Sequence, residues 1–216
     1  MLNVECFVSG DICENCFFVT DDENEVSFVV DPGDFSVRLR QKIIEFGTEK
    51  LKYILLTHGH FDHIYYAADI KKMCPGAKIV IGEKDAPFTN DDMLNSSAFF
   101  GFEIKHFDAD ITVADGDSLD FGNRKIQVIA SPGHTVGGVC YRINDILFTG
   151  DTIMRETFGR VDLPTGDAKQ MFNTLHMLLA IPENLTIYCG HGEKSSLDFE
   201  RKYNPVKRYK RYDDLY

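Results

Sequence analysis

The chain has 216 residues, of which 44% are hydrophobic and 26% are charged, and its formal net charge is −11. This composition is typical of a globular domain and excludes a disordered chain, and an acidic protein repels the phosphate backbone of a nucleic acid. The sequence holds neither an apolar run long enough to span a membrane nor a basic leader followed by an apolar core. We therefore expect a cytoplasmic protein with a small-molecule substrate and with no nucleic-acid or membrane partner.

The first half of the chain predicts strands that alternate with helices. Short apolar runs bounded by turn residues are typical of buried strands, and they cover residues 2–8, 15–20, 25–30, 53–57 and 78–81. Apolar residues at helical spacing predict helices over 34–46 and 63–73.

Each of these helices has a specific expected feature. Four apolar residues would share the buried face of the first helix, namely Phe35, Leu39, Ile43 and Ile44. Asp62 is placed to serve as a cap at the start of the second helix.

The second half predicts five more strands and two helices. The strands cover residues 111–113, 125–129, 139–142, 146–149 and 186–189. A helix over 167–180 begins with Asp167 as its cap and Gln170 three residues later. A last helix begins at Ser195 or Ser196 and ends near Tyr203.

This order of elements predicts a fold of the α/β (α+β) class. Two mixed β-sheets would pack face to face with helices on both outer faces, which is a four-layer αββα sandwich. No segment rich in Gly, Ser or Pro divides the chain, so we expect residues 1–216 to form a single domain. The aromatic stretches at 98–102 and 203–216 either pack within the chain or form the interface of a homodimer, and 98–102 is also a candidate loop over the site.

The segment from Thr57 to His63 reads T-H-G-H-F-D-H and is the most informative motif in the chain. It places His58, His60, Asp62 and His63 within six residues. Imidazole and carboxylate groups together suit zinc, iron or manganese. Bound metal activates water, so this motif predicts chemistry as well as structure.

Three more candidate ligands each follow the end of a predicted strand. They are His134, Asp151 and His191. Strand ends gather on one rim of a sheet, where functional side chains are usually carried. The total of seven ligands exceeds the four or five that one zinc ion accepts, so the count predicts two metal ions.

The order of T-H-G-H-F-D-H, S-P-G-H-T, T-G-D and C-G-H-G in this chain resembles the metallo-β-lactamase fold superfamily. The resemblance covers roughly residues 26–200 and implies an αββα sandwich with its metals on one edge. It implies that His58, His60 and His134 hold one metal. It also implies that Asp62, His63 and His191 hold the other metal and that Asp151 bridges both ions. Asp31 would support the site by contacting the metal ligands without binding a metal itself.

The segment Phe158–Gly166 contains G-R-V-D-L-P and resembles the glyoxalase II-like branch, the hydroxyacylglutathione hydrolases. Asn204 and Pro205 also fit that branch. Full-length glyoxalase II has an extra C-terminal helical domain that carries much of the glutathione site, and we expect this chain to lack it. Arg160 either contacts substrate or forms an ion pair with Asp162.

The resemblance implies hydrolysis of a thioester, of the S-2-hydroxyacylglutathione type, by a hydroxide that bridges two divalent ions. Asp62 and Asp151 would be the catalytic carboxylates, and zinc is the expected metal, with iron or manganese as alternatives. One rival is a sulfur (persulfide) dioxygenase with a single iron at His58, His134 and Asp151, although Leu163 and Pro164 replace the Phe-Gln that is usual there. Other rivals are hydrolases of lactones, β-lactams or phosphodiesters.

Other candidate groups are interpreted as structural. Cys13 and Cys16 form a C-x-x-C pair, but no second pair follows at zinc-ribbon spacing and an apolar run follows Cys16, so a buried thiol is expected. His106 and His176 are expected to be structural or surface groups. The basic cluster near the C-terminus is interpreted as a solvated tail, with an anion or partner contact as the alternative.

Overall fold

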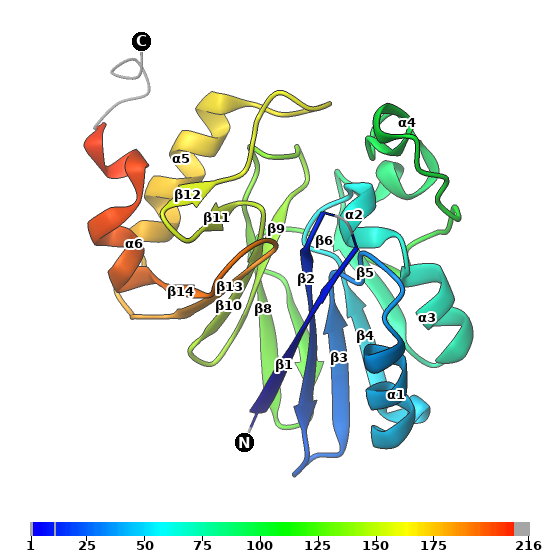
Figure 1. The fold of residues 1–216 in the computed structure, drawn as a ribbon. Coiled ribbons are helices and arrows are strands. Elements are labelled where there is room, and N and C mark those ends of the chain that lie inside the picture. The colour runs from blue at the N-terminus through cyan, green and yellow to red at the C-terminus, as the bar shows by residue number, and fades with distance from the viewer. Residues whose placement is uncertain (1, 11, 210–216) are drawn as a thin grey trace.

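The computed structural model of the chain describes residues 2–10 and 12–209. Within them, two six-stranded sheets lie face to face with helices outside (Figure 1). The first sheet runs β1-β2-β3-β4-β5-β6, with bounds Leu2–Ser9, Glu14–Asp21, Val26–Val30, Leu51–Leu55, Lys78–Gly82 and Ile111–Val113. The second runs β14-β13-β10-β9-β8-β7, with bounds Ser195–Ser196, Thr186–Cys189, Ile146–Gly150, Val139–Ile143, Arg124–Ala130 and Ser118–Phe121.

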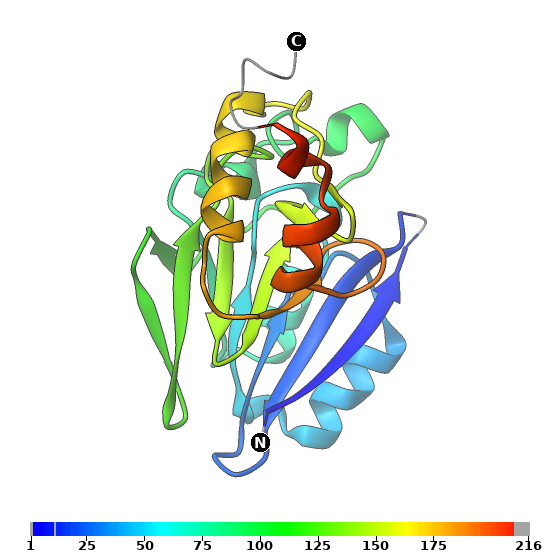
Figure 2. The same cartoon turned by 90° about the vertical axis from the view of Figure 1, so that its left-hand side faces the viewer.

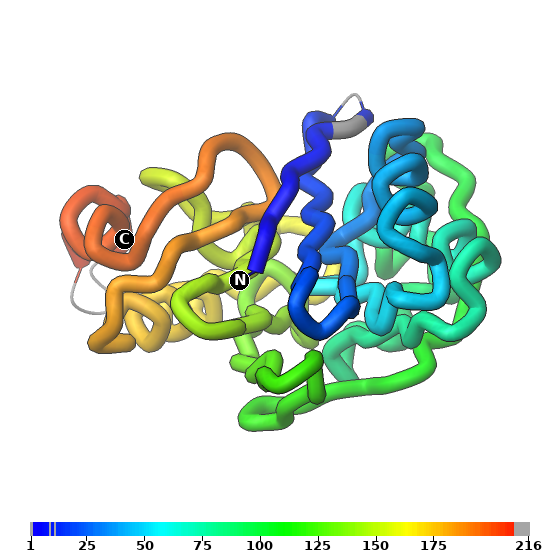
Figure 3. Tube along the Cα trace, turned by 90° about the horizontal axis from the view of Figure 1, so that it is seen from below, coloured from blue at the N-terminus to red at the C-terminus, as the bar shows by residue number. Residues whose placement is uncertain are grey.

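The helices lie on the two outer faces. Figure 2 looks onto the face covered by α5 and α6, and Figure 3 shows the early helices and the last helix on opposite sides of the strands. The helices are α1 (Val37–Phe46), α2 (Phe61–Ile64), α3 (Ala67–Met73), α4 (Ser97–Phe100), α5 (Ala168–Leu179) and α6 (Leu197–Tyr203). Short 3₁₀ helices cover Thr48–Lys50, Ala86–Asn90 and Pro205–Arg208, and β11 (Ile153–Met154) pairs with β12 (Thr157–Phe158).

Three apolar layers account for this arrangement. On β4, Tyr53 and Leu55 face the core between the sheets, whereas Ile54 packs against the outer helices with Leu39 of α1. Alternation along a strand sends successive side chains to opposite faces. A third cluster joins the second sheet to α5 and α6, and includes Leu175. The predicted αββα sandwich is therefore confirmed.

The strand directions bring four loops to one rim. Strands β3, β4, β5 and β6 are parallel neighbours, and β10 is parallel to β13. Strand β8 runs in the same direction as β10, because both are antiparallel to β9. The loops after β4, β8, β10 and β13 consequently leave from carboxyl ends of strands, where α/β sheets usually carry their ligands.

Two helix predictions are wrong in detail. Helix α1 begins at Val37 with Ser36 as its cap, so Leu39 and Ile43 are buried whereas Phe35 and Ile44 are 51% and 50% exposed. The helix expected over 63–73 is divided into α2 and α3 because the backbone N–H of Tyr66 turns away to donate to the carbonyl of Pro32.

Asp62 is not the cap of the second helix. The N-cap position of α2 is His60, and Asp62 lies inside the first turn, where its carboxylate faces His63 and His191. By contrast, Asp167 accepts a hydrogen bond from the backbone N–H of Gln170 and caps α5 as predicted. Ser196 does the same for α6.

The described part of the chain contains no helix that is long and apolar enough to cross a membrane. The aromatic stretch at 98–102 is part helix: α4 ends at Phe100, and the ring of Phe102 stacks on that of Phe61. Residues 210–216, which include two members of the basic cluster, lie outside the described residues.

Candidate metal centre

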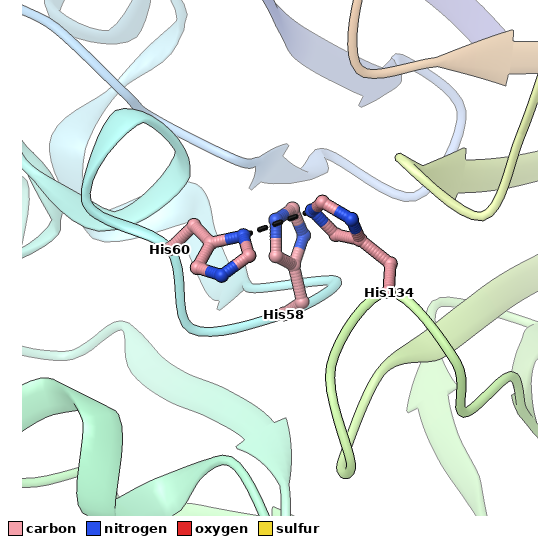
Figure 4. A group of neighbouring side chains, drawn as sticks. All are labelled: His58, His60 and His134. Carbon is pink, nitrogen blue, oxygen red and sulfur yellow. Dashed lines mark hydrogen bonds between the residues drawn. The ribbon is translucent and has the colours of Figure 1, made fainter. Parts of the chain in front are cut away.

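The four rim loops bring together all seven side chains that the sequence singles out. Three groups satisfy the spacing of metal ligands, with donor atoms inside each group within 4.8 Å of one another. Two of them consist only of the seven candidate ligands, and the remaining one joins Asp31 to His58 and His63. The first of the two is His58, His60 and His134, shown in Figure 4, and the second is Asp62, His63 and His191. We call these two groups the three-histidine triad and the Asp62 triad.

In the three-histidine triad, residues from both sheets meet. His58 and His60 follow β4 of the first sheet, whereas His134 follows β8 of the second. The Nδ1 atom of His60 lies 2.8 Å from the Nε2 atom of His134. Two nitrogen ligands of one tetrahedral zinc ion would lie about 3.3 Å apart, so this spacing is close to that of a shared ion.

The donor atoms of the Asp62 triad lie slightly farther apart than those of His60 and His134. The Oδ2 atom of Asp62 lies 3.5 Å from Nε2 of His191 and 3.9 Å from Nε2 of His63. All three donor atoms belong to side chains at loop ends or in the first turn of α2. The adjacent Asp62 and His63 therefore reach the same point from one helical turn.

Asp151, at the end of β10, lies between the two triads. Its Oδ1 atom is 3.4 Å from Nε2 of His63. Its Oδ2 atom is 3.6 Å from Nε2 of His134 and 3.6 Å from Nε2 of His191. One carboxylate thus contacts donors of both triads, which is the position that a bridging ligand requires.

Several buried donor atoms of the centre have no hydrogen-bond partner in the protein. They include Nε2 of His58, Nε2 of His63 and Oδ1 of Asp151. Buried polar groups are almost always satisfied, and an unsatisfied one costs about 1–3 kcal/mol. Because these atoms converge with the other ligand atoms, a pair of divalent cations fits the arrangement.

The electrostatics of the two triads differ. Burial lowers the pKa of His58 well below its usual value and lowers that of His60 to about 3, with His134 adding to the shift of His60. Both rings are therefore neutral at pH 7, which is the form that binds metal. In the Asp62 triad, burial would lower the pKa of His63, but Asp151 and Asp62 raise it well above its usual value.

The outer nitrogens of His58 and His134 are held by the protein. Nδ1 of His58 lies 3.1 Å from the Thr57 hydroxyl, and Nδ1 of His134 lies 2.7 Å from the backbone carbonyl of Arg160. A partner on the outer nitrogen fixes the tautomer and the orientation of a ligand ring. The inner nitrogens are left to face the centre.

The carboxylate of Asp31 contacts both Thr57 and His63. Its Oδ1 accepts a hydrogen bond from the backbone N–H of Thr57 at 2.7 Å. Its Oδ2 accepts one from the Thr57 hydroxyl at 2.6 Å and lies 3.1 Å from Nδ1 of His63. Asp31 therefore orients His63 directly and His58 through Thr57.

Asp31→Asn is expected to weaken metal binding about 10- to 100-fold, which is the usual effect of losing such an outer partner. The new amide would point N–H groups at the Thr57 hydroxyl or at the His63 ring, where an acceptor is needed. Competition of the protein with a chromogenic chelator measures the affinity. Asp22→Asn, in an exposed turn, is the matched control, and equal affinities in the two variants would contradict the role of Asp31.

The side chain of Arg160 forms the ion pair with Asp162 that the sequence suggested. Its Nε and one terminal nitrogen donate to the two carboxylate oxygens at 2.6 and 2.7 Å. Both side chains are more than half exposed. Contact between Arg160 and a substrate stays a prediction.

A pocket of about 180 Å³ opens beside Asp62. It is lined by Gly10, Ile12, Glu14, Gly33, Asp34, Phe61, Asp62, Tyr65 and Phe102. Glu14 is only 2% exposed, and neither of its carboxylate oxygens has a partner in the protein. Sequence reasoning missed Glu14, because its only signal is an acidic residue at the start of an apolar strand.

The remaining candidates lie outside the centre. Cys16 is a buried free thiol, as predicted, and Cys13 is exposed and free. Cys189 is also a buried free thiol, and its Sγ donates to the carbonyl of His191 at 3.2 Å. His106 pairs with Asp92 at the surface.

Comparison with known proteins places this centre in a family. The family model described as the metallo-beta-lactamase superfamily matches residues 14–191, which is more than half of the chain. Hydroxyacylglutathione hydrolase GloC of Haemophilus influenzae is 28% identical over 211 residues, covering 94% of this chain and 97% of that protein.

Two solved structures are similar along nearly their whole length. The BLEG-1 B3 metallo-beta-lactamase superposes with a TM-score of 0.86 at 28% identity, covering 95% of this chain and 98% of that one. TTHA1623, crystallised in a di-iron-bound form, gives a TM-score of 0.80 at 28% identity, covering 94% and 99%. With its sandwich fold, its converging ligand loops and these matches, the chain belongs to the metallo-beta-lactamase superfamily.

Proposed function

We propose that this protein is a metal-dependent hydrolase that cleaves thioesters at a pair of divalent ions. The observation that carries the proposal is the position of Asp151, whose carboxylate contacts donors of both triads at 3.4–3.6 Å. The three-histidine triad would hold one ion and the Asp62 triad the other. When bound, such a pair supplies an activated water and polarises the substrate carbonyl.

The protein contributes orientation and exclusion of water. His58, His60 and His63 are each no more than 3% exposed, so their donor atoms keep one direction and do not have to displace solvent. The Thr57 hydroxyl, the Asp31 carboxylate and the Arg160 carbonyl hold the rings of His58, His63 and His134, respectively, before metal arrives. Preorganised groups of this kind cost no reorganisation during reaction.

The pocket beside Asp62 is the proposed binding site of the acyl group. Its apolar walls come from Ile12, Phe61, Tyr65 and Phe102, and the side chains that line it include no lysine, arginine or histidine. Besides Glu14, its acidic groups are Asp34 and Asp62, so an anionic group is disfavoured there by like charge, whereas burial raises the pKa of Glu14 well above its usual value. A small acyl group without a carboxylate fits both features.

The leaving group departs more easily from a thioester than from an amide, and this difference supports a thioester substrate. A thiol has a pKa of about 8.5 and leaves as a thiolate without a strong acid, whereas an amine must be protonated first. The similarity to GloC supports an S-acyl glutathione as the substrate type. The similarity to BLEG-1, at the same 28% identity, makes a β-lactam the rival to test.

Zinc is the proposed metal, with iron or manganese as alternatives. Imidazole and carboxylate ligands accept all three ions. The di-iron form of TTHA1623 supports iron as the first alternative.

The test is turnover of S-lactoylglutathione by the purified protein, beside a chromogenic cephalosporin and a persulfide with oxygen uptake recorded. We expect thioester hydrolysis that is lost on metal removal and restored by adding metal back. Faster cleavage of the β-lactam would assign the rival hydrolase activity. Oxygen consumption with one iron per chain, or full thioester turnover after metal removal, would contradict the proposal.

A further inference from the structure

A buried carboxylate that belongs to none of the metal-ligand motifs lies behind the three-histidine triad. Asp85 follows β5 of the first sheet and is 0% exposed. Its Oδ2 accepts hydrogen bonds from the backbone N–H of Gly59 at 3.0 Å and from the hydroxyl of Thr135 at 2.6 Å. Its Oδ1 accepts one from the backbone N–H of Gly137 at 2.6 Å.

These donors lie next to metal-ligand candidates on two different loops. Gly59 separates His58 from His60 in the loop after β4, and Thr135 directly follows His134 in the loop after β8. The two loops leave from different sheets. A single carboxylate therefore joins the two halves of the sandwich at the point where His60 and His134 meet.

Packing around Asp85 reinforces the same contact. Phe88, three residues later, donates its backbone N–H to the carbonyl of Asp85, and its ring lies 6.2 Å from that of His60. A Cβ atom at Gly59 would come within 2.6 Å of the Phe88 ring. The loop that carries His60 therefore packs closely against the segment that carries Asp85.

The free-energy cost of burying the Asp85 carboxylate argues that this residue has a role. An ionised carboxylate out of water is unfavourable unless it is fully hydrogen-bonded. Burial raises the pKa of Asp85 to about 6, and the hydrogen bonds from Thr135, Gly137 and Gly59 oppose that rise. Asp85 is therefore ionised at neutral pH, with three donors directed at it.

We propose that Asp85 is a positioning residue, which holds His60 and His134 at the spacing that one metal ion needs. The inference rests on the proposed metal centre. Loss of Asp85 should weaken metal binding at the three-histidine triad only, because His134 belongs to that triad alone. The Asp62 triad is held separately, by Asp31 at His63 and by the loop that carries His191.

The experiment is a cobalt titration of metal-free Asp85→Asn, followed by the visible absorption of the bound ion and by competition with a chelator. The amide nitrogen would replace either Oδ2, the acceptor of Gly59 and Thr135, or Oδ1, the acceptor of Gly137, so at least one of the two loops loses a hydrogen bond to residue 85. We expect one ion bound as in the unaltered protein and the other about 10- to 100-fold more weakly, as for other outer partners of ligands.

Glu200→Gln is the matched control. Glu200 is also 0% exposed and accepts hydrogen bonds from the Ser195 hydroxyl, the backbone N–H of Glu156 and the side chain of Asn204. None of these partners is in a candidate metal group. This variant is expected to lose thermal stability and to keep both cobalt affinities.

Thr135→Val is the second variant, because it removes one hydrogen bond with little change of shape. It should weaken the same ion as Asp85→Asn, by a smaller factor. Unchanged affinities in Asp85→Asn, or equal weakening of both ions, would overturn the role of Asp85. If the unaltered protein itself bound no cobalt, the proposed metal centre would fail instead, so the two failures are distinguishable.

Discussion

Replacing Asp151 with alanine is expected to abolish binding of the metal pair and to lower kcat for the thioester at least about 100- to 1000-fold, the range seen when a key electrostatic group is removed. The physical reason is that the Asp151 carboxylate contacts donors of both triads. Without it, the buried nitrogens of His63 and His134 lose their shared negative partner. Metal analysis and steady-state kinetics on the same preparation measure both effects.

Asp145→Ala is the control for this change. Asp145 is exposed and lies in the turn that precedes β10, the strand that carries Asp151 at its other end. It should keep full metal content and activity. Two retained metal equivalents in Asp151→Ala would contradict the bridging role.

The second large effect is expected from a single methyl group, in Gly190→Ala. A Cβ atom there would overlap Oδ1 of Asp151 and come within 2.6 Å of Cε1 of His63. The backbone of Gly190 is not in the left-handed region, so the main conflict is with the two side chains of the centre, and a lesser one is with the backbone carbon of Gly150 at 3.2 Å. We expect the loss of at least one metal ion and about a 100-fold or greater fall in kcat/KM.

Stability distinguishes this steric effect from general misfolding. Overpacking costs about 1–3 kcal/mol in the free energy of unfolding, which denaturant titration of the metal-free protein would measure. Gly76→Ala is the matched control, because a Cβ there meets nothing within 4 Å and the φ angle is not positive. A Gly190→Ala protein with normal metal content would show that the centre is less tightly packed than the distances indicate.

The layers of the fold could be predicted from the sequence because local patterns determine them. Runs such as Tyr53-Ile54-Leu55 must be buried on both faces, and only a sandwich with outer helices covers both. The short β7 was not predicted, because Ser118–Phe121 has only two buried positions. Phe35 and Ile44 were placed wrongly, because apolar spacing alone does not say which side of a helix meets a neighbour.

The candidate ligands could be found because histidines and aspartates at strand ends form a recognisable motif. Asp62 shows the limit of local reasoning: an aspartate before a helix is usually a cap, whereas here its carboxylate is directed at His63 and His191. The break after α2 arises from the contact of Tyr66 with Pro32, which are far apart in sequence.

Glu14 and Asp85 could not have been found in this way. Each is a single acidic residue without a motif, and its significance comes from burial beside segments that are distant in sequence. Asp85 contacts Thr135, 50 residues away. Only the closure of the two sheets brings such pairs together.

Anomalous diffraction from crystals of the metal-loaded protein, recorded at the absorption edge of the metal, tests the metal centre most directly. Two peaks are predicted on either side of the Asp151 carboxylate, one within about 2.0–2.2 Å of the three-histidine triad and one at the same distance from the Asp62 triad. A single peak, or none among these seven side chains, would contradict the account.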